Sequence, residues 1–266
     1  MKQSISFPSS TVLDFTMAIM FFTVSFVLAM SKTQKHSPEE ITFTTVSMAE
    51  NISPEKEISQ KLFVMAGIGM FFASVLIYVQ YGKPLTKTNG GKGLQQALMI
   101  TKILMAIFLV IQSISSLQQE WNLALEEFTL REYFKPITIV HFVSAILLFT
   151  MIFLNMLLYI IFTNVYHKEH KKQIIYKFRV FLFVVYSFSA LIMLWMVAIE
   201  MVWKQRDKDL GITYAEVNAF GFFEWIGVIT GFIYISSFRK EMKNFTVNLE
   251  GDWLLNFLPR KILGKK

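Results

Sequence analysis

The sequence has no cysteine and few charged side chains, and each absence excludes a class of protein. Without cysteine, the chain cannot be a disulfide scaffold. Charged residues make up only 17% of its 266 residues, whereas a water-soluble domain carries about 25%. Phosphate-binding glycine loops, Ser-centred nucleophile elbows and HExxH zinc motifs are also missing from the sequence. We therefore expect a membrane protein that is not an enzyme and that uses no metal or cofactor.

Six long apolar runs stand out in a sequence that is 54% hydrophobic. About 20 apolar residues in a helix cross the hydrocarbon core, where every backbone polar group must be paired within the chain. The sequence predicts an all-α polytopic membrane domain over residues 1–251, followed by a basic amphipathic tail over residues 252–266. The six predicted transmembrane helices cover residues 12–30, 62–81, 97–117, 136–163, 180–203 and 219–238.

The first apolar run has a second interpretation, as a signal peptide with a cleavage site at Val27-Leu28-Ala29. The run is long for such a segment, and Asp14 lies at its start. We therefore expect the run to be retained as the first transmembrane helix.

Basic residues are distributed unevenly between the two sides of such a bundle. The side that holds both termini has 16 Lys and Arg, and the opposite side has 9. Because basic connections stay in the cytosol, both termini are predicted to be cytosolic. The net charge of +7 therefore reflects membrane orientation, and we expect no nucleic-acid partner. Asn51 lies in a sequon of the first outer loop and is a glycosylation candidate, whereas Asn244 lies in a cytosolic sequon and is expected to stay unmodified.

Five ionisable residues lie within the apolar runs, where charge is costly and often functional. Asp14 and Lys102 lie near the cytosolic ends of their runs; they either pair with each other or snorkel to the headgroups, and we favour snorkelling. His141, Glu200 and Glu224 lie toward the outer ends. Two carboxylates and an imidazole at similar depth suit a proton-responsive site and, less well, a metal site. We favour a helix-packing role for these three, with Glu224 as the strongest functional candidate.

The tail and the glycines complete the set of candidate contacts. Gly67 and Gly69 in the second run, and Gly227 and Gly231 in the sixth, permit close helix contact, which we assign to packing within the chain. The tail mixes apolar and basic residues, as an interfacial segment on an anionic leaflet does. The expected partners are the lipid bilayer, anionic lipids of the cytosolic leaflet, and membrane or cytosolic proteins. Candidate headgroup contacts are Trp253, Arg260, Lys261, Lys265 and Lys266.

Short motifs occur in a fixed order along residues 7–251. In that order and spacing the chain resembles the DRAM family of damage-regulated autophagy modulators and its FRAG-type and yeast four-kinase-suppressor relatives. Gln80 and Ser116 stand where the family has Arg and Asn, which is typical of a divergent member. Arg179 matches a family Arg, and we expect it to anchor its helix. The motifs are Phe7-Pro8, Ser53-Pro54-Glu55, Ile77-Tyr78-Val79-Gln80-Tyr81, Leu117-Gln118-Gln119-Glu120, Val140-His141, Phe223-Glu224-Trp225 and Thr246-Val247-Asn248-Leu249-Glu250-Gly251.

The resemblance implies a non-catalytic six-span protein that modulates autophagy or lysosomal membranes, located in a lysosomal or other endomembrane rather than the plasma membrane. Two alternatives stay open, because relatives of one fold carry out different functions. One is a plasma-membrane scaffold for a phosphatidylinositol 4-kinase complex, as the yeast-type relatives imply. The other is a transporter or a GPI- or lipid-remodelling factor that uses His141, Glu200 and Glu224.

Overall fold

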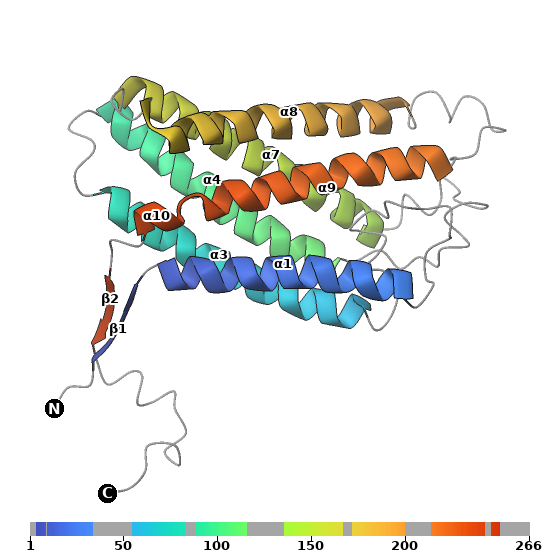
Figure 1. Ribbon diagram of the computed structural model, residues 1–266, viewed down its shortest axis with the longest axis horizontal. Helices are drawn as coiled ribbons and strands as arrows, with labels where there is room; N and C mark the ends of the chain where they lie inside the picture. Colours follow the sequence, from blue (N-terminus) through green and yellow to red (C-terminus); the bar gives the residue numbers. More distant parts are fainter. Residues whose placement is uncertain are drawn as a thin grey trace, which may run out of the picture.

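The computed structural model describes residues 4–8, 10–33, 55–82, 89–115, 136–166, 172–199, 214–242 and 246–250. Figure 1 shows the long helices side by side in one bundle, with both strands at the end where the chain termini lie. In chain order the elements are β1 (Ser4–Pro8), α1 (Ser10–Thr33), α3 (Glu55–Gly82), α4 (Asn89–Ile114), α7 (Pro136–Tyr166), α8 (Ile174–Ile199), α9 (Tyr214–Ser236), α10 (Arg239–Met242) and β2 (Thr246–Glu250).

The six long helices each contain a segment that is long and apolar enough to cross a membrane. This confirms the predicted six-helix membrane fold. The helices extend beyond the predicted apolar runs: α4 begins at Asn89 and α8 at Ile174. A helix can continue past the hydrocarbon core because water and headgroups solvate polar side chains in the interfacial region.

The order of helix contacts follows the chain. α1 packs against α3, α3 against α4, and α4 against α7, while α8 pairs with α9. Further contacts between α7 and α8 and between α1 and α9 close the six helices into a ring. The first and last long helices of the chain, α1 and α9, are therefore neighbours in the bundle.

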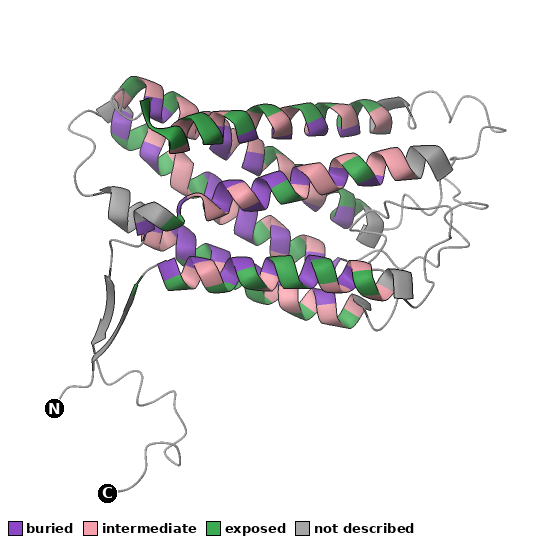
Figure 2. Ribbon diagram, viewed as in Figure 1, coloured by how far each residue is buried: buried purple, intermediate pink, exposed green. Residues whose placement is uncertain are grey.

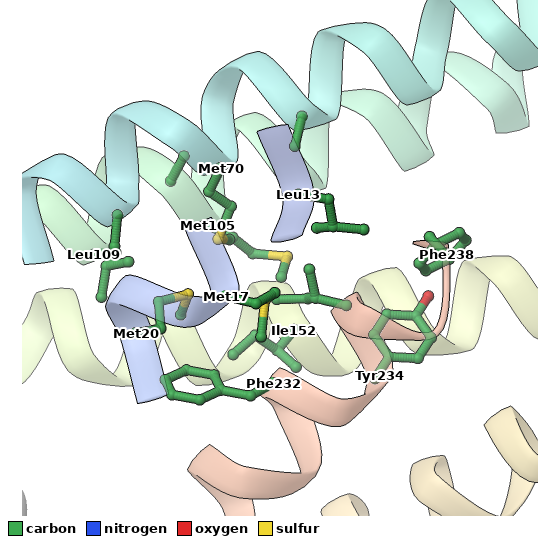
Figure 3. Packing of buried hydrophobic residues seen from close by; sticks show 14 of the residues in the cluster. Leu13, Met17, Met20, Met70, Met105, Leu109, Ile152, Phe232, Tyr234 and Phe238 are labelled. Carbon is green, nitrogen blue, oxygen red and sulfur yellow. The ribbon is translucent and has the colours of Figure 1, made fainter. Parts of the chain in front are cut away.

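Apolar side chains both fill the bundle and cover it. Inside, Met17, Met70, Met105 and Ile152 belong to one buried cluster, which Figure 3 shows between α1, α3, α4, α7 and α9. Outside, large apolar side chains are exposed along the helices, as the green segments of Figure 2 show, and Trp195 is 65% exposed. Helices that are apolar on all sides are typical of membrane spans, because lipid replaces water around them.

The glycines lie where helices approach closely. A Cβ added to Gly67 would lie 2.5 Å from Cγ2 of Val110 on α4, and one added to Gly69 would collide with the Thr16 hydroxyl on α1. Gly231 of α9 faces Ile152 of α7. These glycines therefore lie at close contacts between helices of the same chain, as the sequence analysis expects.

The β1–β2 pair is the one part of the described fold that the helical pattern does not predict. The two strands are antiparallel, with Ser6 opposite Asn248 and Pro8 opposite Thr246. Each strand has five residues, and its partner lies at the other end of the chain, so no local periodicity indicates the pairing. The pair places both terminal segments on the same side of the bundle (Figure 1). Whether that side faces the cytosol stays a prediction.

Candidate functional site

Polar side chains gather at the end of the bundle where α1 begins and α9 ends, which we call the inner end because the charge distribution predicts it to be cytosolic. The inner end also carries β1, β2 and α10 (Figure 1). The set defined here as the inner polar cluster comes from six helices (α1, α4, α7, α8, α9 and α10) and the turn after α9. Its members are Asp14, Thr101, Lys102, Asn155, Tyr159, Arg179, Tyr234, Ser237 and Arg239.

Arg179 of α8 is the most buried charged residue in this cluster, with no exposed surface. Its Nε donates to Ser237 Oγ at 2.7 Å, its Nη2 donates to the Ser237 carbonyl oxygen at 2.8 Å, and its Nη1 donates to the Tyr159 hydroxyl. The guanidinium also lies 4.0 Å from the centre of the Phe238 ring. Carbonyls after the last turn of α9 have no partner within the helix and attract a cation. Arg179 therefore joins α7, α8 and the end of α9, in agreement with the expected anchoring role.

Asn155 of α7 joins a second set of helices. Its Nδ2 donates to Thr101 Oγ1 at 2.7 Å and to the Leu98 carbonyl oxygen at 2.9 Å, both on α4. Its Oδ1 accepts a hydrogen bond of 3.0 Å from the Tyr234 hydroxyl of α9. Asn155 is fully buried, and these bonds compensate for the hydrogen bonds to water that its amide loses on burial. The amide connects α4, α7 and α9 at one level.

Asp14 and Lys102 do not pair with each other. Asp14 Oδ1 accepts a hydrogen bond of 2.6 Å from Arg239 Nε, in an exposed ion pair between α1 and α10. The bond to Asp14 raises the pKa of the Arg239 guanidinium, which is cationic in any case. Lys102 is only 9% exposed, and its Nζ lies 3.8 Å from the centre of the Phe238 ring. The Lys102 amine therefore lies against the Phe238 ring inside the protein at the inner end.

His141 and Glu224 lie elsewhere in the bundle, and the structure gives no contact between them. His141 is 2% exposed near the backbone of Gln112 and Ser115 on α4, and neither ring nitrogen makes a hydrogen bond of ordinary geometry to a described residue. Glu224 is 6% exposed on α9. The described part of the chain contains no group of three or more His, Asp or Glu side chains that could hold a metal ion.

A small cavity opens next to the inner polar cluster. Its volume is about 40 Å³, and it lies between α3, α4 and α7 beside the turn after α9. Gln95, 6% exposed, lies about two helical turns before Lys102 on the same face of α4, and its Nε2 has no hydrogen-bond partner among the described residues. The spacing of seven residues indicates that both side chains share one face of the helix. Gln95 is not among the residues predicted from the sequence, because its side chain carries no charge. The lining residues are Ser74, Ile77, Gln95, Leu98, Met99, Lys102, Tyr159, Phe162 and Phe238.

A larger groove lies on the outside of the bundle, between α1 and α3. Its volume is about 420 Å³, and its lining includes Phe15, Ile68 and Phe72, which are all exposed. Every residue of its lining except Thr11 is apolar. It brings no titratable side chain together with another.

Several predicted site residues lie outside the described residues. They are Glu200, the glycosylation candidate Asn51, and the headgroup candidates Trp253, Arg260, Lys261, Lys265 and Lys266. Their roles stay predictions.

Comparison with known proteins assigns the chain to a family. No curated protein and no solved structure matches it significantly. A family model described as the Frag1/DRAM/Sfk1/Cwh43P N-terminal domain matches residues 8–245. The match includes all six long helices and every member of the inner polar cluster. The chain is therefore a multi-pass membrane protein that belongs to the Frag1/DRAM/Sfk1/Cwh43P family, which confirms the resemblance seen in its sequence motifs.

Proposed function

We propose that this protein is a non-catalytic modulator of autophagy or lysosomal membranes, acting as a rigid six-helix bundle. One observation carries the non-catalytic part of this proposal: the two fully buried polar residues of the inner end, Asn155 and Arg179, form hydrogen bonds that join helices. Polar groups inside a membrane are costly and are retained for function or for packing. Here packing accounts for both side chains.

The location of the outer candidates supports the same proposal. An integral-membrane enzyme or transporter built on His141 and Glu224 needs both groups to face a common cavity that admits substrate. Neither residue lines either of the two cavities described above. The family membership supports a membrane role without specifying a reaction.

The test is the location and effect of the full-length protein carrying a small tag. A lysosomal or other endomembrane signal is expected, together with a change in autophagic flux when the gene is deleted. Glu224→Gln should leave both unchanged. If that variant instead abolished a measurable transport or lipid-modifying activity while its expression and location stayed normal, the non-catalytic proposal would be wrong.

A second candidate is a plasma-membrane scaffold for a phosphatidylinositol 4-kinase complex. It is favoured by the Sfk1 relatives within the family and by the predicted excess of basic residues on the inner side. Basic segments beside a membrane attract anionic lipids at about 1 kcal/mol per residue. A plasma-membrane signal, with loss of kinase recruitment on deletion of the gene, supports this candidate over the first.

A further inference from the structure

The β1–β2 pair separates apolar from polar residues on its two faces. Residues directly opposite each other in an antiparallel pair share a face, and successive residues of a strand alternate between the faces. One face therefore carries the cross-strand pairs Ile5–Leu249 and Phe7–Val247, and all four residues are apolar. The other face carries Ser4, Ser6, Pro8, Thr246, Asn248 and Glu250. The pairing thus gathers four apolar residues from the two ends of the chain on one face.

This apolar face needs a partner. A single pair of strands is at best marginally stable in water unless its apolar face packs against something else. β1 and β2 pack mainly against each other, and no described helix makes comparable contact with either strand. Pro8, on the polar face, is exposed. The partner of the apolar face therefore lies outside the described helices.

The position of the strands indicates that this partner is lipid. One residue separates Pro8 from Ser10, where the first apolar span begins, so the pair lies at the level of the membrane surface. Figure 1 shows both strands running across the direction of the long helices and extending past α1, beyond the edge of the bundle. Because the helices cross the membrane, this direction runs along the membrane surface. The leaflet at the inner end is therefore the apolar phase next to the strands.

The composition of the strands suits the interface between headgroups and acyl chains. Glu250 is the only charged residue in the two strands, so apolar contact rather than charge draws the pair to lipid. The outer edge of each strand presents backbone N–H and C=O groups that no neighbouring strand pairs. Such groups are too costly in hydrocarbon, whereas water and headgroups solvate them at the interface. The pair therefore fits on the leaflet and not within its hydrocarbon core.

We propose that the β1–β2 pair lies on the leaflet at the inner end, with the face of Ile5, Phe7, Val247 and Leu249 against lipid and the opposite face toward water. This contact holds both terminal segments at the membrane surface. The inference goes beyond the proposed function and does not depend on it, since the strands can lie on whichever membrane the protein resides in. The two are tested by different measurements, the depth of single residues in the bilayer and the location of the protein in cells.

The absence of cysteine from the natural sequence allows one position at a time to be labelled. Single-cysteine variants of the full-length protein, labelled with the polarity-sensitive fluorophore NBD, are placed in phosphatidylcholine nanodiscs, where both membrane surfaces are accessible. Ile5→Cys and Leu249→Cys should show blue-shifted emission, quenching by nitroxide-labelled lipid and loss of quenching by aqueous iodide. Ser6→Cys and Asn248→Cys, each one position away, are the matched controls and should be quenched by iodide instead.

Three other results would overturn the proposal. Equal quenching by iodide at all four sites would mean that the strands lie in water, away from the leaflet. Protection of the two apolar-face sites from both quenchers would mean that protein covers this face. Lipid quenching at the two control sites alone would mean that the opposite face lies on the leaflet. Thermal unfolding reports whether each labelled variant is folded, and the single variants Phe7→Cys and Val247→Cys replace any that is not.

Discussion

Single residues at the inner end show how a polar group is accommodated inside a membrane bundle. Arg179 has no exposed surface, yet each of its three guanidinium nitrogens donates to Tyr159 or to Ser237. Its planar fork matches acceptors that lie on two different elements at once. The exposed pair of Asp14 with Arg239 is of another kind, because water and ions screen it. At this scale, burial decides which charged contact matters for stability.

Replacing Arg179 with lysine tests this difference. Arg179→Lys keeps the charge and loses the fork, so we expect the free energy of unfolding to fall by about 1.5–3 kcal/mol. Thermal or denaturant unfolding in detergent, followed by tryptophan fluorescence, measures the change. Lys177→Ala, at an exposed position on the same end of α8, serves as the control and should shift stability by no more than about 0.5 kcal/mol. Equal stability of Arg179→Lys and the control would contradict the anchoring role.

At the scale of elements, the helix contacts depend on positions where a side chain is missing. Gly67 lets α3 approach α4: an added Cβ would meet Val110 Cγ2 at 2.5 Å and the Ala106 carbonyl oxygen at 3.2 Å. A backbone carbonyl and a β-branched side chain have little room to yield. The small residues of α3 thus determine how closely three consecutive helices pack.

Alanine substitutions at two glycines separate packing from helix propensity. Gly67→Ala should destabilise the protein by about 1–3 kcal/mol, because it overpacks the contact between α3 and α4. Gly93→Ala on α4 has nothing within 4 Å of the new Cβ, and should be neutral or stabilising by up to about 1 kcal/mol. Unfolding of both variants in the same detergent checks the prediction. A stabilising effect of Gly67→Ala would show that the two helices are farther apart than described.

The strand pair can be tested by cross-linking, since the chain has no cysteine of its own. Ser6 and Asn248 lie opposite each other, and Cα atoms across an antiparallel pair are about 4.5–5.5 Å apart, within the range of a disulfide. The double variant Ser6→Cys/Asn248→Cys should lose both free thiols on mild oxidation of isolated membranes, as counted by a maleimide gel shift. Ser6→Cys/Glu250→Cys, displaced by roughly 7 Å along the strand, is the control and should keep its thiols. Efficient closure in the control alone would mean a different register.

For the whole molecule, the open question is which side of the membrane each end faces. Both terminal segments lie at the inner end, and α9 ends beside the start of α1 (Figure 1). The arrangement is equally compatible with either orientation, since helix packing does not distinguish the cytosolic side from the outer side. The excess of Lys and Arg in the connections on one side predicts the orientation.

Glycosylation in cells reports the orientation directly. Asn51 is expected to be modified and Asn244 to stay unmodified, because only the outer side meets the glycosylation machinery. The wild type should therefore shift on a gel after glycosidase treatment, and Asn51→Gln should not. Modification that persists in Asn51→Gln and disappears in Asn244→Gln would reverse the predicted topology.

The sequence by itself determined the number of membrane helices, their approximate limits, the family and the ionisable residues within the helices. These properties are local, because a run of about 20 apolar residues and a short motif can be read along one dimension. The tertiary structure alone decided which polar residues meet. Asp14 and Arg239 are 225 positions apart, and Asn155 and Tyr234 are 79 apart. Such partners depend on how each helix is rotated and how far it slides past its neighbours. Packing of side chains sets the rotation and the axial shift of each helix. Helices that are apolar on all sides have no polar face, so the periodicity of their sequence indicates neither quantity.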